Sequence, residues 1–581
     1  MQGHDKDGLQ AFGRRFFGAE QTVSQIGEGE LGGKGAGLDL IHRKIIPRLE
    51  SGEFEEFKVA VPTFTVLGTE VFEFFIERNE LEEIALSDEP DDRIAHAFQK
   101  ASFPAEVVGD LRALIRDVHT PLAVRSSSLL EDALNHPFAG VYETKMIPNN
   151  DFSEDRRFKR LIEAIKFVYA SAFFQGAKRY LRSVKQDIQS ERMAVVIQEV
   201  VGARREDRFY PVISGVARSY NYYPSGHSEP EDGVVDLALG LGKQIVDGGL
   251  SWSFAPTYPR SPLPFNDIGD ILKNTQRGFW AVHMGKVTAP DPIHETEFLK
   301  EAELEDAESD EVLNYLVSTY DPGSDRIRPG MAQKGPRVLD FAPILRTSSL
   351  PVNDLVKKLL EITVEELGTA VEIEFAIELG VFPKEPARFG FLQARPMMLP
   401  GEEIQLPEEE LTGDGILVAS EQSLGNGLRE DISDVVYLKP DVFDAQYTME
   451  IAKELEGINR DLMDSDRECL LMGFGRWGSS DRWLGVPVDW GQICSARVIV
   501  EATTPDMITD MSQGSHFFHN VISFRVLYLS VKHSGEYDID FKWLDSQEVV
   551  SETRFVKHVR LDKPLLVKVD GRNGRGVIRH G

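Results

Sequence analysis

The chain has 581 residues, with 64 Lys or Arg against 95 Asp or Glu, and its formal net charge of −31 argues against nucleic acids and membrane surfaces as partners. The length suits about three to four domains, and an apolar content of 41% excludes wholesale disorder. The two cysteines, Cys469 and Cys494, are too few for a disulfide scaffold, and the lack of a signal peptide or long apolar run predicts a cytoplasmic protein.

Strand and helix patterns alternate along the first two thirds of the chain. Residues 160–181, RLIEAIKFVYASAFFQGAKRYL, place apolar side chains at spacings of three and four and predict one amphipathic helix. Short, largely β-branched runs predict buried strands at 122–124, 193–201, 211–217 and 389–394. This alternation predicts a mixed α+β architecture.

Two polar stretches suggest how the domains divide. Residues 295–311, ETEFLKEAELEDAESDE, carry nine acidic side chains and one Lys, and predict a solvated helix or insertion. Residues 399–415, LPGEEIQLPEEELTGDG, concentrate Pro, Gly and Glu, as linkers do. We therefore expect a first domain at 1–399, a linker at 400–415 and a C-terminal domain at 416–581.

The first segment whose residues suggest a functional site is a glycine-rich turn at residues 31–41, LGGKGAGLDLI, which runs into helical spacing from Leu38. Glycines let backbone N–H groups approach phosphates, a helix N-terminus adds partial positive charge, and Lys34 can reach a phosphoryl oxygen. No GK[ST] closes the segment, so it is not a Walker A motif. Gly33 and Lys34 are candidate phosphate ligands, and an ordinary turn is the alternative.

The second segment, LAVRSSSLLEDALNHPFAGVYET at 122–144, places Arg125 at the end of a short strand. A planar guanidinium aimed into a cleft is well suited to hold phosphate oxygens. The alternative is a surface ion pair with Glu131 or Asp132. A third segment, the end of the 193–201 strand, is able to present Gln198 and Glu199 to an adenine and ribose.

The fourth segment pairs acidic and basic side chains on neighbouring strands. In VEIEFAIEL, Glu372 and Glu374 stand at i and i+2 and share one face of a strand. Two adjacent carboxylates need positive charge between them, and Mg²⁺ bound to nucleotide phosphates supplies it. Gln393 and Arg395, in FLQARP, would complete this site, and a solvent-facing stripe of charge is the alternative.

Together, GGKGAGL, AVRSSSLLEDALNHPFAG, AVVIQEVV, SGVA, LGLGKQIVDGG, IEFAIEL and FLQARP resemble the nucleotide-binding domain of the phosphoenolpyruvate synthase and pyruvate phosphate dikinase family, in that family's order. The resemblance implies an ATP-grasp fold, with ATP between two α+β lobes and magnesium bridging its phosphates. It makes Lys34 and Arg125 similar to the family's phosphate-binding pair, and Glu199 similar to the adenine-side hinge position. The residues that it relates to the metal are Glu372, Glu374 and Gln393, although relatives often have Asp in place of Glu372.

The C-terminal region departs from that family. Residues 416–581 are too few for the pyruvate or phosphoenolpyruvate barrel of relatives, since such barrels take about 250 residues. A swivelling phosphohistidine domain is the other expected part, and His516, after a strand and a glycine turn, is the best candidate nucleophile. Phe517 and Phe518 replace the small residues of relatives, so a structural histidine is the alternative. A metal site of His516 and His519 lacks a third ligand.

GFGRWG at 473–478 spells GxGxxG, but the turn-rich SSDRWLGVPVDW that follows argues against a dinucleotide-binding helix. Arg476, Ser479, Ser480, Asp481 and Arg482 instead suggest an anion or acceptor pocket, with Trp477 and Trp483 as walls.

We expect an α+β protein in which a two-lobed ATP-grasp domain precedes a smaller C-terminal α/β domain. It would be an ATP-dependent, dikinase-like phosphotransferase that uses Mg-ATP and passes a phosphoryl group to a histidine, or to a small-molecule or protein acceptor that the sequence does not name. Alternatives are an ATP-binding sensor module and one subunit of a split dikinase. A homodimer, or association with a partner dikinase subunit, stays open.

Overall fold

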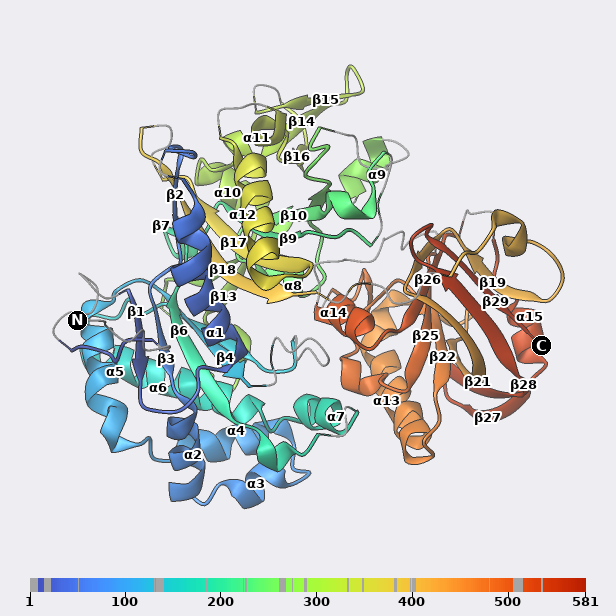
Figure 1. Cartoon of the computed structure of the whole chain (residues 1–581), viewed down its shortest axis with the longest axis horizontal. Helices are drawn as coiled ribbons and strands as arrows, with labels where there is room; N and C mark the ends of the chain where they lie inside the picture. The colour runs from blue at the N-terminus through green and yellow to red at the C-terminus, as the bar shows by residue number, and fades with distance from the viewer. Residues whose placement is uncertain are drawn as a thin grey trace.

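The computed structural model shows two masses, one made by roughly the first two thirds of the chain and one by the C-terminal part (Figure 1). The described residues are 9–14, 22–50, 52–129, 131, 140–183, 186–222, 224, 227–260, 268–273, 275–286, 290–331, 334–346, 350–380, 384–397, 399, 404–479, 481–504, 516–533 and 537–580. Within these ranges, every helix is too short or too polar to cross a membrane.

The first sheet has the order β1-β3-β6-β4-β5, in which only β1 and β3 run parallel. Its centre, β6, is completely buried except at its last residue because helices cover the apolar face. The strands are Val23–Ile26 (β1), Phe64–Leu67 (β3), Leu122–Ser128 (β4), Thr144–Ile147 (β5) and Met193–Glu199 (β6). The helices around it are Thr69–Arg78 (α2), Glu82–Leu86 (α3), Asp91–Lys100 (α4), Ala105–Asp117 (α5), Glu154–Ser171 (α6) and Gln175–Ser183 (α7).

The second sheet has the order β11-β10-β9-β17-β18-β2 and packs against helix α12. Helix α1, Gly32–Leu40, lies between the two sheets and contacts β4 and β6 of the first and β18 of the second. The remaining bounds are Phe57–Ala60 (β2), Ile213–Arg218 (β9), Val234–Ala238 (β10), Trp252–Phe254 (β11), Val371–Glu378 (β17), Ala387–Pro396 (β18), Lys243–Val246 (α8) and Val352–Leu367 (α12). The helix in the glycine-rich segment 31–41 therefore starts at Gly32, six residues before Leu38, where the sequence predicts it to begin.

Two smaller sheets, β13-β12-β8-β7 and β15-β14-β16, extend the second lobe. Their elements are Ala203–Arg205 (β7), Arg208–Tyr210 (β8), Gly278–His283 (β12), Leu299–Glu303 (β13), Val317–Asp321 (β14), Arg326–Pro329 (β15), Arg337–Leu339 (β16), Ile268–Lys273 (α9), Leu304–Ser309 (α10) and Ala342–Arg346 (α11). The acidic stretch 295–311 is solvated on one face, as predicted, and includes the short helix α10, but strand β13 also crosses it. Its apolar residues Phe298, Ala302 and Ala307 are buried.

The C-terminal sheet has the order β19-β29-β28-β21-β22-β25-β26-β20, with β27 also paired to β28. Strands β21, β22, β25 and β26 run parallel, with α13 in the crossover from β21 to β22 and α14 in the crossover from β25 to β26. The bounds are Ile416–Ser420 (β19), Gln422–Leu424 (β20), Asn426–Leu438 (β21), Cys469–Phe474 (β22), Arg476–Trp477 (β23), Gly485–Val486 (β24), Ala496–Ala502 (β25), Leu527–Val531 (β26), Glu548–Glu552 (β27), Val556–Asp570 (β28), Arg575–Arg579 (β29), Thr448–Asp464 (α13), His516–Ser523 (α14) and Phe541–Asp545 (α15).

The mixed α and β architecture is confirmed. GFGRWG continues from β22 into β23, so no helix follows it, as predicted. Two details differ from the predictions. The helix predicted at 160–181 is two helices, α6 and α7, separated by a turn. In the predicted linker, Leu406 and Leu411 are buried against the C-terminal sheet.

Candidate functional site

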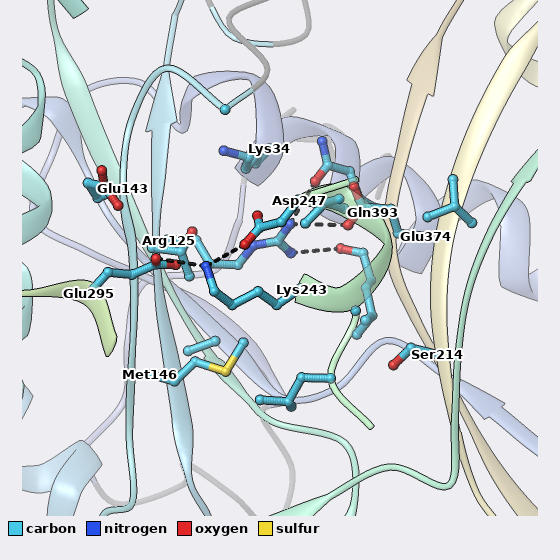
Figure 2. A pocket seen from close by; sticks show the side chains of 18 of the residues that line it. Lys34, Arg125, Glu143, Met146, Ser214, Lys243, Asp247, Glu295, Glu374 and Gln393 are labelled. Carbon is cyan, nitrogen blue, oxygen red and sulfur yellow. Dashed lines mark hydrogen bonds and ion pairs between the residues drawn. The ribbon is translucent and has the colours of Figure 1, made fainter. Parts of the chain in front are cut away.

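A cavity of about 540 Å³ lies where the two lobes and the C-terminal domain meet. This volume falls within the range of about 300–1,000 Å³ typical of small-molecule sites. In Figure 2 the side chains of Lys34, Arg125, Glu374 and Gln393 lie close together on one part of it. The lining residues predicted from the sequence are Lys34, Arg125, Gln198, Glu199, Glu374, Gln393, Arg395 and Ser479.

Lys34 extends from the first turn of α1 toward the cavity. Its Nζ donates to Ser126 Oγ at 3.1 Å and to Glu131 Oε1 at 2.6 Å. The first turn of α1 packs tightly on β4 on both sides of Lys34, because Gly35 N donates to Ser127 Oγ and a Cβ on Gly32 would fall 1.7 Å from Ser127 O. Helix α1 is therefore fixed against β4, whereas Gly33 is not among the described residues that line the cavity.

Arg125 stands in the middle of β4 and reaches across to the second sheet. Its Nη1 donates to Gln198 Oε1 at 3.3 Å and to Leu392 O at 3.1 Å, and its Nη2 donates to Gln393 Oε1 at 2.7 Å. The carboxylate of Glu374 lies 3.6 Å from Nη2. The alternative of an ion pair with Glu131 does not hold, since Glu131 pairs with Lys34, and Asp132 lies outside the described residues.

The two carboxylates of β17 have different surroundings. Glu374 is 16% exposed and lines the cavity. Glu372 is 1% exposed, lies 2.6 Å from Arg218 Nε, and accepts a 2.9 Å hydrogen bond from Arg395 Nε. Positive charge beside each carboxylate therefore comes from arginines, and Glu372 is absent from the described lining of the cavity.

The expected hinge residues lie at the end of β6. The backbone N–H groups of Glu199 and Val200 donate to Thr63 O and Pro121 O, both at 2.9 Å. The carboxylate of Glu199 accepts a hydrogen bond of 2.6 Å from Thr120 Oγ1. Both residues line the cavity with Gln198, but these two backbone donors are already used within the protein.

Sequence reasoning missed Lys243, which sits in α8 within the quoted motif LGLGKQIVDGG. Its Nζ lies 2.7 Å from Asp247 and 2.8 Å from Glu295, and all three line the cavity (Figure 2). The two carboxylates raise the pKa of Lys243 above its ordinary value, against the opposing effect of burial. The sequence signal that could have identified Lys243 is a charged residue directly after Gly242.

Glu143, also missed, faces the same region from the segment before β5. Burial, followed by the nearby carboxylate of Glu295, raises the pKa of Glu143 to about 7. The pKa of Glu295 is raised by burial as well. This part of the cavity is therefore acidic, whereas Lys34 and Arg125 make the other part cationic.

The C-terminal domain supplies one wall of the cavity through Ser479, Val488, Trp490, Phe517 and Asn520. Two contacts hold this wall in place: Arg476 Nη1 donates to Gly248 O at 2.8 Å, and Arg179 Nη2 donates to Asp489 Oδ2 at 2.6 Å. Arg476 thus contacts the backbone beyond α8 rather than an open pocket. Trp477 is buried, Trp483 is exposed, and Ser480 lies outside the described residues.

His516 is the first residue of α14, next to the cavity-lining Phe517. The side chains of His516 and His519 lie outside the described part of the chain. The backbone of His516, the candidate nucleophile, therefore lies at the cavity wall.

The side chains around the cavity determine how a Mg²⁺ ion could be held there. In the part of the chain that the structure describes, no three His, Cys, Asp or Glu side chains gather to hold a metal by themselves. Mg²⁺ is usually held by one or two carboxylates together with substrate phosphates, so a complete protein cage is not required. The carboxylate of Glu374 and the amide oxygen of its strand partner Gln393 fit this incomplete donor set, whereas Glu372 is committed to two arginines.

Comparisons with known proteins find one matching family and several distant relatives. A family described as pyruvate phosphate dikinase, AMP/ATP-binding domain, matches residues 28–412. Phosphoenolpyruvate synthase of Aeropyrum pernix is 25% identical over 414 residues, which are 66% of this chain and 43% of that protein. Uncharacterized phosphotransferase YvkC of Bacillus subtilis is 26% identical over 202 residues, 33% of this chain and 20% of that protein. Rifampicin phosphotransferase of Streptomyces sviceus is 26% identical over 235 residues, 39% of this chain and 24% of that protein. The chain spans less than half the length of each of these relatives.

Proposed function

The chain belongs to the pyruvate phosphate dikinase AMP/ATP-binding domain family, as its motifs predict, and we propose that it is an ATP-dependent phosphotransferase of the dikinase type. The first domain would be an ATP-grasp unit that holds ATP between its two lobes. One observation carries the proposal: Lys34, Arg125, Glu374 and Gln393, from distant segments of the sequence, line one cavity.

Lys34 and Arg125 would act on the phosphates. The ammonium of Lys34 has three donors, and with two directed to Ser126 and Glu131 the third serves a phosphoryl oxygen. The guanidinium of Arg125 is held by Gln198 and by residues of β18, so little reorganisation is needed as charge develops on the transferred group. Both cations would lower the free energy of the transition state.

A bound Mg²⁺ would supply charge neutralisation on the nucleotide phosphates. We assign Glu374 and Gln393 to hold it. Glu372 would instead fix Arg395, which lines the same cavity, so that the strand bearing Gln393 keeps its place. Gln198 and Glu199 would lie at the nucleoside end.

The acceptor would approach from the wall formed by the C-terminal domain. This placement is supported by Ser479, Phe517 and Asn520, which come from residues 416–581 and line the same space as Lys34. Direct transfer to a bound molecule and transfer through His516 are the two routes that this wall allows. The domain division at 400–415 and cytoplasmic location remain part of the proposal.

Incubation with ATP labelled at the β- or γ-phosphate tests the function. Acid-labile label on the chain would support a phosphohistidine, whereas acid-stable label on an added metabolite would support direct transfer. Binding without consumption of ATP would favour a nucleotide sensor. Turnover that requires added carrier and barrel proteins would favour one part of a split dikinase.

His516→Ala separates the two transfer routes. If His516 carries the phosphoryl group, the variant binds ATP as the parent does but takes up no label. Persistent labelling and turnover would remove His516 from the mechanism. The thermal unfolding temperature of the variant, compared with that of the parent, shows whether the substitution damages α14.

A further inference from the structure

Glu131 contacts Lys34 from a position that the mechanism above does not use. It follows β4 by three residues, and its side chain is 3% exposed. Its Oε1 accepts from Lys34 Nζ at 2.6 Å, while its Oε2 accepts from Ser128 N at 2.8 Å. The carboxylate is therefore fixed at one end by the backbone of β4 and at the other by the ammonium.

Ser126 closes this arrangement into a triangle. Its Oγ donates to Glu131 Oε1 at 2.8 Å and accepts from Lys34 Nζ at 3.1 Å. A lysine side chain carries about 2 kcal/mol of rotamer entropy, so an unrestrained ammonium would sample many positions. Charge-assisted hydrogen bonds to a buried, oriented carboxylate restrict it to one.

The restraint has an electrostatic cost. A carboxylate 2.6 Å from the ammonium cancels part of the positive field that attracts ATP, so Glu131 does not act by strengthening ground-state binding. Its contribution is to orientation, which matters most when the phosphoryl group is transferred. A residue that does this is expected to affect turnover more than affinity.

We propose that Glu131 is the positioning residue for Lys34: it holds the ammonium beside Ser126 so that the remaining N–H points to the phosphoryl group being transferred. This inference rests on the proposed function. Glu131 lines the cavity too, but its carboxylate oxygens already accept from Lys34, Ser126 and Ser128, so its role in transfer would run through Lys34.

Glu131→Gln tests the proposal, because it removes the charge and leaves a single acceptor oxygen. With that oxygen on Ser128 N, the amide NH2 faces Lys34 Nζ and no longer accepts from it. We expect turnover of labelled ATP to fall at least tenfold, with the calorimetric Kd for ATP within threefold of the parent. Glu163→Gln is the matched control, since Glu163 pairs with the exposed Lys159 at 3.6 Å. Turnover within threefold of the parent would overturn the proposal.

A double-mutant cycle with Lys34→Met shows whether Glu131 acts through Lys34. In the Lys34→Met background, Glu131→Gln should change the residual rate less than twofold. An equal loss in both backgrounds would contradict the proposal and assign Glu131 a separate or merely structural part. If Glu131→Gln does not fold, Ser126→Ala removes the bridging hydroxyl and should reproduce the split between turnover and affinity in weaker form.

A labelling experiment keeps this inference separable from the proposed function. Acetic anhydride should acetylate Lys34 several-fold faster in Glu131→Gln than in the parent, as measured by mass spectrometry, with Lys159 as the internal standard. ATP should protect Lys34 in the parent and protect it less in the variant. An unchanged rate at Lys34 would overturn the positioning role. A parent protein that consumes no ATP would contradict only the transferase, because the labelling still gives its own result.

Discussion

Arg125 Nη2 donates a 2.7 Å hydrogen bond to Gln393 Oε1, although the two residues are 268 positions apart. Arg125 belongs to β4 of the first sheet and Gln393 to β18 of the second, so this bond crosses between the two lobes. The same guanidinium donates to Leu392 O, the neighbouring backbone group on β18. Arg125 therefore fixes the separation of the lobes at the place where it would hold a phosphate.

Arg125→Ala removes these interlobe bonds and a cavity cation together. Hydrogen bonds to charged groups contribute about 1.5–3 kcal/mol each, so we expect the Kd for ATP to rise about 10- to 100-fold. Isothermal calorimetry measures this change. Arg112→Ala, which removes an exposed pair with Asp155, should leave the Kd unchanged. An Arg125→Ala protein with parental affinity would place the nucleotide elsewhere.

The neighbouring carboxylates Glu372 and Glu374 should respond to substitution in opposite ways. Glu372→Gln removes the buried carboxylate that Arg218 and Arg395 share, although Arg218 keeps Asp236, and removal of one partner from a buried ion pair costs about 3–5 kcal/mol. We therefore expect a large fall in the thermal unfolding temperature. Glu374→Gln should leave that temperature near the parental value.

In Glu374→Gln, the loss should instead appear in the metal dependence. The Mg²⁺ concentration for half-maximal ATP consumption should rise about tenfold or more, because a carboxylate that faces the cavity is replaced by a neutral amide. Metal titrations of the parent and both variants measure this. If Glu372→Gln changes the metal dependence and Glu374→Gln does not, the assignment of the two residues is reversed.

How far the sequence predicts the site depends on the range of the interaction. Lys34 after a glycine turn and Arg125 on a strand are local features, so their residue types and elements were readable. The partner of Glu131 could not be predicted, because it lies on α1, which packs on β4 although more than ninety residues separate the two contacting side chains in sequence. Local spacing suggested Arg125 as that partner, whereas the fold brings Lys34 there.

Glu372 shows the same limit. Its shared strand face with Glu374 follows from the two-residue period of a strand. The arginines beside it come from β9 and β18, and the order of strands in the sheet is a tertiary choice that the 371–378 segment does not encode by itself. Strand β13, inside the acidic stretch 295–311, was not predicted for a related reason: it forms by hydrogen bonding to β12, some twenty residues earlier in the sequence.

Glu143 should make stability depend on pH. Its pKa is about 7 in the folded protein, against an ordinary value of 4.5, so the folded state holds a proton that the unfolded chain has released between these pH values. Stability therefore falls as pH rises from about 4.5 to 7, by up to about 1.4 kcal/mol per pH unit, and levels off above 7. Burial is the main cause of this raised pKa; the charges of Glu295, Asp247 and Asp91 raise it further and that of Lys243 lowers it.

Glu143→Gln removes that titration. Denaturant unfolding at pH 5, 6, 7 and 8 should show the variant gaining stability relative to the parent as pH rises to 7, with no further gain at pH 8. Glu163→Gln, at a surface pair, provides the control. A difference between variant and parent that is constant across this range would contradict the raised pKa.

Gly478, on the cavity wall, should be sensitive to substitution. Its φ is +74°, and a Cβ placed there would lie 2.6 Å from the ring of Phe517, which lines the cavity beside it. Gly478→Ala therefore combines backbone strain with a steric clash, and overpacking of this kind costs about 1–3 kcal/mol. We expect a lower unfolding temperature and slower ATP turnover, because Phe517 and α14 must shift away from the nucleotide lobes. Gly457→Ala is the control: Gly457 lies inside α13 with no atom within 4 Å of the added Cβ, so alanine should stabilise the helix by about 0.5–1 kcal/mol. If both substitutions raise the unfolding temperature and leave turnover unchanged, the close approach of Gly478 to Phe517 does not shape the cavity.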